Sequence, residues 1–236
     1  MENLSFLPKK FRILSGSALK LLAVIFMIID HIAVAFLSKN PILLFTVGSK
    51  AFTLYHIMRY IGRLAFPLFA FLLVEGFLHT KNRKAYGQNL LIFALISEIP
   101  WNLFRSGTWH FSGQNIFFTL FLGFLGLLVL EKFKDKPTKQ VLLLLLGFIL
   151  SIVLKVDYLA GGYVFILLLY ILRDKRAAQA VIGCSILSNG LIAGLSFLPI
   201  NMYNGERGFI KGRFMKYAFY AIYPIHILIL FIIKKI

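Results

Sequence analysis

The chain has 236 residues, of which 59% are hydrophobic, and its 26 Lys and Arg residues outnumber 9 Asp and Glu to give a net charge of +17. A soluble domain is only about 45–50% apolar, so the composition argues against a soluble globular protein and predicts an all-α, polytopic integral membrane protein. Membrane topology explains a basic excess, so we expect the lipid bilayer, not nucleic acid, as the partner.

The first apolar segment, 17–37, is long enough to span a bilayer, and the basic residues 1–16 before it are expected to stay in the cytoplasm. We expect this segment to remain as a helix and not to be cleaved as a signal peptide. About eight spanning helices are predicted within a single transmembrane domain, 17–236. The others lie at 55–79, 86–103, 114–131, 139–156, 158–173, 177–199 and 214–233, and an apolar run at 41–48 is too short to cross.

The loop charges predict how the chain is threaded through a bacterial cytoplasmic membrane. With the N-terminus inside, most Lys and Arg residues fall in inner loops, which favours an even number of spans and two cytoplasmic termini. The segment 201–216, "NMYNGERGFIKGRFMK", is an exception, because it is basic and yet lies outside in this topology. It is either a solvated turn or a patch for an anionic group.

Three ionisable residues interrupt the first apolar segment: Lys20, Asp30 and His31. A charged side chain at the centre of a membrane helix costs roughly 2.5–3.5 kcal/mol, so such residues usually have a function. Lys20 and His31 are eleven positions apart, which places them on one helix face and about 16.5 Å apart along the axis. Asp30 lies about 100° round the helix, where it is able to contact a neighbouring helix.

The second segment carries a polar stripe, because His56, Arg59 and Arg63 follow an i, i+3, i+7 pattern. Pro67 predicts a kink where this stripe ends. Nearer the inner end, an i, i+4 pair is formed by Glu75 and His79.

Further polar residues lie at Glu98, Asn115, Asp157 and His226. Most of these polar groups also have a structural explanation, as interface residues, as an ion pair between Lys155 and Asp157, or as a packed helix histidine. His31 and Arg63 are harder to explain in this way, because both fall inside long apolar runs. The sequence contains no zinc-binding signature, no phosphate-binding glycine loop and no nucleophile elbow, and its one cysteine, Cys184, excludes an intrachain disulfide.

Several stretches resemble the TraX family, which is named for a conjugative-plasmid protein that N-acetylates pilin. They occur in the family's order and include "LKLLAVIFMIIDHIAVAF", "RYIGRLAFPLFAFLLVEGFLHTKNRKAY" and "KYAFYAIYPIHILIL". The likeness covers about residues 17–233. The spacing of Lys20 and His31 also resembles the Arg/Lys-x10-His motif of the type 3 membrane acyltransferases.

These resemblances imply acyl transfer from acetyl-CoA, with no metal, to an amine or hydroxyl acceptor such as a pilin N-terminus or an envelope glycan. His31 takes the role of general base, and we group the other candidates by expected role. The catalytic group is His31, Asp30, Arg63 and Glu98; the donor-binding group is Lys20 and Arg59; further polar pocket residues are Glu75, Asn115, Asp157 and His226.

Two other classes of function stay open. Intramembrane Asp, Glu and His residues also build the pathways of proton-coupled transporters. A non-catalytic membrane component of a conjugation or envelope machine is the third possibility. An acyltransferase predicts one polar pocket, and we expect His31, Arg63 and Glu98 to line it in the outer half of the bundle.

Overall fold

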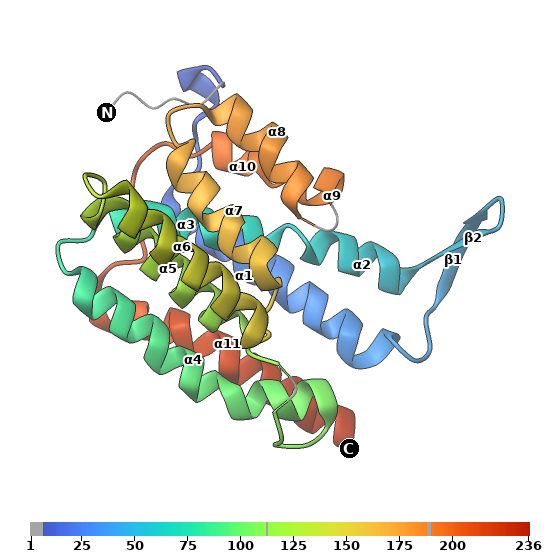
Figure 1. The fold of residues 1–236 in the computed structure, drawn as a ribbon. Coiled ribbons are helices and arrows are strands. Elements are labelled where there is room, and N and C mark those ends of the chain that lie inside the picture. Colours follow the sequence, from blue (N-terminus) through green and yellow to red (C-terminus); the bar gives the residue numbers. More distant parts are fainter. Residues whose placement is uncertain (1–6, 112, 188–189) are drawn as a thin grey trace.

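The polar residue before the first apolar segment starts the first long helix. The Ser15 side chain accepts the backbone N–H of Ala18 at 3.3 Å and so caps α1 (Gly16–Ile32), which continues as a π-helical turn, η2 (Ala33–Leu37). A short 3₁₀ helix, η1 (Lys9–Phe11), precedes it. This computed structural model describes residues 7–111, 113–187 and 190–236, and Figure 1 shows a helical bundle with one projecting hairpin.

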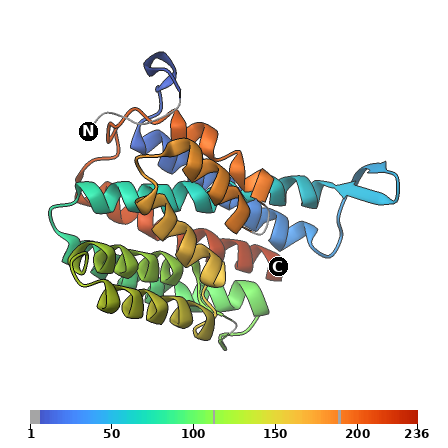
Figure 2. The same cartoon turned by 45° about the horizontal axis from the view of Figure 1, so that its top comes forward.

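The apolar run at 41–48 does not form a helix. It supplies β1 (Leu43–Val47), which pairs antiparallel with β2 (Lys50–Thr53). Gly48 has a φ of 59°, which suits the tight turn between the strands. Figures 1 and 2 both show this hairpin extending away from the helices, beyond the end of η2.

The second apolar segment is broken where its polar stripe ends. Helix α2 (Leu54–Gly62) and helix α3 (Ala65–His79) are separated at Arg63 and Leu64. Pro67 has no N–H to donate to the carbonyl group of Arg63 four residues earlier, which explains a break at this point. The predicted kink is therefore confirmed.

Four further helices run to and fro between the two ends of the bundle. Three of them start at a cap or a proline: Asn82 and Asn115 each accept a backbone N–H, and Pro137 occupies the first turn of its helix. The fourth follows Tyr158, which has a left-handed backbone conformation. The helices are α4 (Arg83–Ser106), α5 (Ile116–Lys132), α6 (Pro137–Val153) and α7 (Leu159–Ile171).

The predicted span at 177–199 does not form one helix. It is divided into α8 (Arg176–Ile186), α9 (Gly190–Gly194) and α10 (Phe197–Asn201). Gly183 packs against Phe197, and Gly194 packs against Cys184, so the later helices fold back along α8. Figures 1 and 2 show this doubling back.

Both ends of this folded-back unit reach the same residue. Arg176, at the start of α8, lies 3.8 Å from the Glu75 carboxylate, and Tyr203, just after α10, shares a side-chain hydrogen bond with Glu75. The chain therefore leaves and returns at one end of the bundle. The prediction that this segment crosses as a single helix is wrong, because its apolar residues are used in a re-entrant turn.

The last helix, α11 (Gly212–Lys235), runs parallel to α1. Their starts are close, because the backbone N–H groups of Gly16 and Ser17 donate to the carbonyl oxygens of Glu206 and Arg207. Farther along both helices, His31 contacts His226. Two helices that meet in this order point in the same direction.

The start of α1 and the end of α11 consequently lie at opposite ends of the bundle, as Figure 1 shows. The prediction of two cytoplasmic termini assumed that residues 201–216 lie across the membrane from the start of α1, whereas the hydrogen bonds of Gly16 and Ser17 place this segment beside it. The side of the membrane on which each terminus lies stays a prediction. We define the basic end as the end where α1 and α11 begin. Arg207, Lys211 and Arg213 join the basic residues there and are no longer an exception to the charge distribution.

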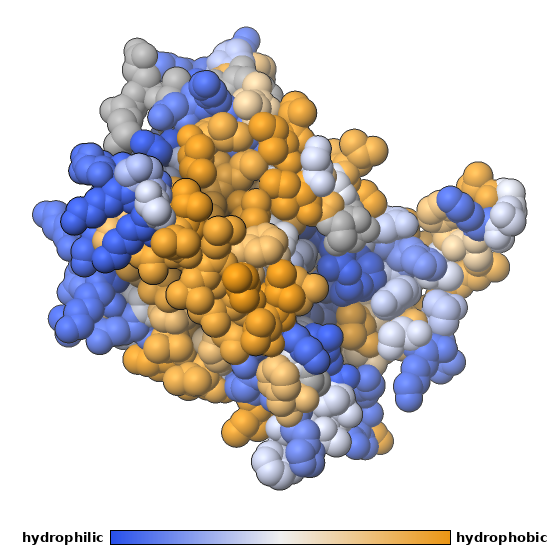
Figure 3. Space-filling model, in the orientation of Figure 1, coloured by the Kyte–Doolittle hydropathy of each residue, from blue (hydrophilic) through white to orange (hydrophobic). Residues whose placement is uncertain are grey.

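The surface has the polarity of a membrane protein. Among the described residues, three helical stretches are long and apolar enough to cross a bilayer: Gly16–Leu37, Leu54–His79 and Gly212–Lys235. Figure 3 shows apolar side chains gathered over the middle of the molecule, with hydrophilic side chains at its left end and lower right. Eight spans remain a prediction.

Candidate functional site

His31 lies between helices in an aromatic environment. Its ring contacts Trp101 and Phe104 of α4 and Tyr223 of α11, with ring centroids 6.4, 5.5 and 6.1 Å away. Its Nδ1 is 2.7 Å from Nε2 of His226. His31 therefore hydrogen-bonds another histidine, and aromatic rings surround the two.

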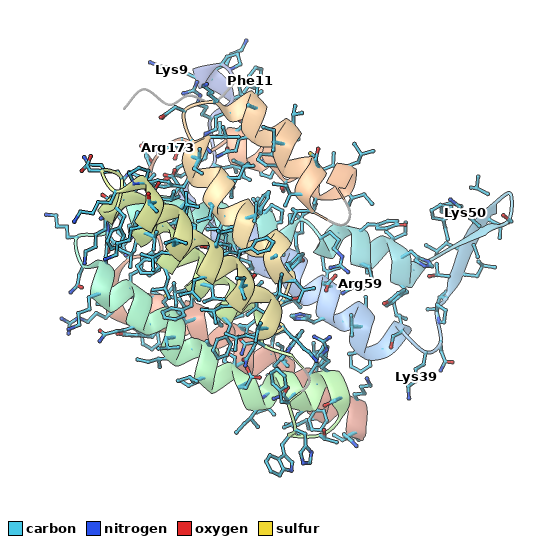
Figure 4. The ribbon with its side chains drawn as sticks, viewed as in Figure 1. Lys9, Phe11, Lys39, Lys50, Arg59 and Arg173 are labelled. Carbon is cyan, nitrogen blue, oxygen red and sulfur yellow. The ribbon has the colours of Figure 1, made fainter. Side chains whose placement is uncertain are left out.

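Arg59, in the polar stripe on α2, faces Asp30, the residue before His31. Arg59 donates to the carboxylate of Asp30 in an ion pair, as predicted for an acid directed at a neighbouring helix. Figure 4 shows Arg59 directed from α2 toward α1. Gly62 leaves room for this acid, because an added Cβ there would clash with Oδ1 of Asp30.

Arg63 joins a second acid to the same charged network. It hydrogen-bonds the hydroxyl of Tyr158 and interacts electrostatically with Asp30 and Asp157. The α6–α7 loop presents these groups: Tyr158 has a φ of 61°, an unusual conformation for a non-glycine residue. Burial raises the pKa of Asp157, in this loop, to about 6.

Glu98 belongs to a neighbouring amide cluster. Its carboxylate accepts from Asn115 at 2.8 Å and from Asn102 at 3.4 Å. Asn115 is fully buried, and it also caps α5 by accepting the N–H of Phe117 at 3.0 Å. Asn115 thus ties the acid on α4 to the start of the next helix.

A cavity of about 620 Å³ opens at the basic end and runs between α1, α3, α4, α5 and α11. Its size is in the range of small-molecule sites, about 300–1,000 Å³. Four basic residues line its outer part: Lys20, Lys81, Arg207 and Lys216. They give the entrance a positive charge suited to an anionic ligand.

The inner end of this cavity is apolar and lies beside His31. Buried Met27, Phe117 and Tyr223 line it. Met27 precedes His31 by one helical turn, and the Tyr223 ring contacts the rings of both His31 and His226. The cavity therefore leads from a basic entrance toward the histidine pair.

Glu75 is the acid that the cavity lining contributes among the described residues, and it is well compensated. The side chains of Arg176 and His79 both approach it to 3.8 Å, which confirms the predicted i, i+4 pair. Burial raises the pKa of Tyr203 to about 12, so its hydroxyl is a donor to Glu75. These contacts hold α3, α8 and the segment after α10 together.

The predicted site residues thus form three adjoining clusters, whereas the sequence predicted that they line a single polar pocket. His31 pairs with His226, and Glu98 pairs with Asn115. In the third cluster, Arg59 pairs with Asp30, and Arg63 interacts with both Asp30 and Asp157. Lys20 and Glu75 line the cavity, but His31, Arg63 and Glu98 do not, so the expectation that these three share its wall is not met. Bulky aromatic side chains such as Tyr223 separate them from it. The described residues contain no metal-type cluster of three or more His, Cys, Asp or Glu.

Several residues of the cavity escaped the sequence analysis. Arg207 and Lys216 belong to the segment 201–216, whose alternative interpretation was a patch for an anionic group, so the signal was present but the predicted topology put it at the wrong end of the bundle. Outside the lining, the sequence predicts Arg176 as a loop residue between two spans, whereas it lies 3.8 Å from the carboxylate of Glu75. Tyr223 carries no charge and precedes a proline, so no sequence pattern distinguished it.

Comparison with known proteins points to one family. The family model described as "TraX: TraX protein" matches residues 15–234. A curated protein of Dichelobacter nodosus, described as "Probable fimbrial assembly protein FimC, serogroup H1", is 32% identical to the chain, and the alignment covers 92% of the chain and 94% of that protein. No solved structure matches.

Proposed function

Because the chain belongs to the TraX family, we propose that it is a membrane-embedded acetyltransferase that serves the assembly or modification of a pilus or fimbria. The donor is acetyl-CoA, and the acceptor is an amine or hydroxyl group, with the N-terminus of a pilin-type subunit as the first candidate. The observation that carries the proposal is the cavity, which joins a basic entrance to the surroundings of His31.

The cavity suits a long donor with phosphates at one end and a thioester at the other. Lys20, Arg207 and Lys216 are able to bind phosphate groups at the entrance. An arm that follows α1 inward covers about 16.5 Å between the levels of Lys20 and His31. Apolar and aromatic walls along this path suit the uncharged part of the donor.

The chemistry needs a base, because a protonated amine does not attack a thioester. His31 accepts the acceptor's proton as the new bond to the acetyl carbon forms. The tetrahedral intermediate then breaks its carbon–sulfur bond, and the leaving thiolate takes the proton back from His31. The aromatic surroundings of His31 exclude water and so limit hydrolysis of the thioester.

The test is transfer of labelled acetyl from acetyl-CoA by the purified protein in liposomes, with pilin-type peptides and hydroxyl acceptors. His31→Ala should lower kcat by about 10²–10⁴-fold, the range for a lost general base. His110→Ala is the matched control, since His110 is exposed and does not line the cavity. Full activity in His31→Ala would remove the base assignment.

A transporter is the competing function, and the charged network of Asp30, Arg59, Arg63 and Asp157 is the observation in its favour. It predicts proton flux across liposomes that requires Asp30. Flux without acetyl transfer to any acceptor would replace the acetyltransferase proposal.

A further inference from the structure

The two histidines meet edge to edge. His31 Nδ1 and His226 Nε2 are 2.7 Å apart, and the ring planes differ by only 16°. Two rings stacked face to face keep all their atoms farther apart than this, so the contact lies close to the ring planes. That is where an imidazole N–H and an imidazole lone pair point, and the contact is a hydrogen bond.

The protonation of this pair follows from a second contact of His226. Its Nδ1 is 2.7 Å from the backbone carbonyl oxygen of Ile222. A carbonyl oxygen only accepts, so Nδ1 of His226 carries a proton, and in the neutral ring Nε2 carries a lone pair. His31 must then donate from Nδ1, which leaves Nε2 of His31 as its acceptor nitrogen.

The surroundings favour two neutral rings. Trp101, Phe104 and Tyr223 offer no anionic partner to a charged imidazole, and Arg59 is the charged group that acts on His31. A protonated imidazole here would lose its hydration without gaining an ion pair with an acidic side chain. The neutral tautomers set by Ile222 are therefore the favoured ones.

We infer that His226 is a positioning residue, which holds His31 in the Nδ1–H tautomer and so presents its Nε2 as the base. The inference rests on the proposed acetyl transfer. When Nε2 of His31 takes the acceptor's proton, its Nδ1–H continues to donate to His226, and the ring does not rotate. The proton on Nε2 then passes to the leaving thiolate, so both rings return to their starting states.

Nitrogen NMR of ¹⁵N-histidine-labelled protein in nanodiscs tests the tautomer without any activity. We expect the His31 signal, identified by its loss in His31→Asn, to report a protonated Nδ1 and an unprotonated Nε2. His226→Phe should shift His31 toward the Nε2–H form or a mixture. A His31 that is Nε2–H in the unaltered protein, or one that does not respond to His226→Phe, would overturn the inference.

Kinetics give the second readout. His226→Phe should lower kcat by about tenfold or more and leave the KM for acetyl-CoA unchanged, because a misplaced tautomer removes the base but not the binding site. His226→Gln should recover part of kcat, since its amide oxygen is able to accept from His31. His110→Ala is again the control. An equal loss in the Phe and Gln variants, with the His31 tautomer unchanged, would assign His226 to packing alone. If no acetyl transfer occurs at all, the proposed function fails, and the NMR result still decides the tautomer.

Discussion

Ser17 donates its hydroxyl proton to the backbone carbonyl oxygen of Arg207 at 2.8 Å, and the same hydroxyl accepts the backbone N–H of Ile210 at 2.8 Å. One buried serine therefore fixes the start of α1 against the segment that leads into α11. The parallel course of these two helices and the entrance of the cavity both depend on this attachment.

The first prediction concerns topology. Reporter fusions in the loop 204–212 should read cytoplasmic and fusions after residue 236 should read external, because the basic end collects most Lys and Arg residues. Paired alkaline phosphatase and fluorescent-protein fusions measure both positions. A cytoplasmic C-terminus together with an external 204–212 loop would contradict the parallel arrangement of α1 and α11.

The second prediction concerns donor binding. Lys20→Ala and Lys216→Ala should each raise the KM for acetyl-CoA about tenfold or more with little change in kcat, since a hydrogen bond to a charged group contributes about 1.5–3 kcal/mol. Added salt should raise the KM of the unaltered protein for the same reason. Lys50→Ala is the control, because Lys50 lies on the hairpin, far from this entrance (Figure 4). A kcat effect without a KM effect would assign Lys20 to the chemistry.

The third prediction compares two ion pairs. Asp30→Ala should lower the free energy of unfolding by about 1–3 kcal/mol, because Arg59 then keeps a largely buried charge without this partner. Glu131→Ala breaks the more exposed pair with Arg83 and should cost about 0–1 kcal/mol. Unfolding in detergent, measured by intrinsic fluorescence, supplies both values. Equal costs would show that the Asp30 pair is not a structural contact.

The fourth prediction concerns space beside Asp30. Gly62→Ala should destabilise the protein and displace the acid, because the new Cβ would clash with Oδ1 of Asp30. Gly161→Ala is matched to it as a helical glycine, and there the nearest heavy atom to a new Cβ is 3.6 Å away. We expect Gly161→Ala to be neutral or stabilising by about 0.4–1 kcal/mol. Thermal unfolding of the two variants measures both effects. A Gly62→Ala variant more stable than Gly161→Ala would contradict the prediction.

The fifth prediction follows from the raised pKa of Asp157, which lies outside the membrane-spanning helices. Its folded pKa of about 6 exceeds the value of 3.8 for an unperturbed carboxyl, so the folded protein binds a proton that the unfolded chain releases. Stability should therefore fall as pH rises from about 4 to 6 and level off above that. Asp157→Asn should flatten this part of the profile, measured by thermal unfolding from pH 4 to 8. An unchanged slope in the variant would assign the pH dependence to other groups.

The sequence predicted local features well, since they depend on nearby residues. The helices around Lys20 and His31, the break before Pro67 and the Glu75–His79 pair all follow from hydropathy, proline chemistry and helical periodicity. The direction of Asp30 toward another helix follows from its angle to His31.

The sequence does not predict that the chain, after α8, α9 and α10, returns to the same end of the bundle from which α8 began. The apolar run at 177–199 is long enough to span, and hydropathy does not distinguish one span from a re-entrant unit. This single error moved Arg207 and Lys216 to the wrong end of the bundle and hid the basic entrance. The contact between His31 and His226 was equally out of reach, because it depends on the relative direction of two helices far apart in the sequence.

That distance has a consequence for synthesis. His226 follows His31 by 195 positions, so the ribosome makes the base long before it makes the group that orients it. During most of translation the first helix sits in the membrane without its partner, and any chain released early carries His31 with its tautomer unset. The histidine pair therefore forms only when the last helix is complete, so the proposed acetyl transfer would require a chain that has been synthesised through His226.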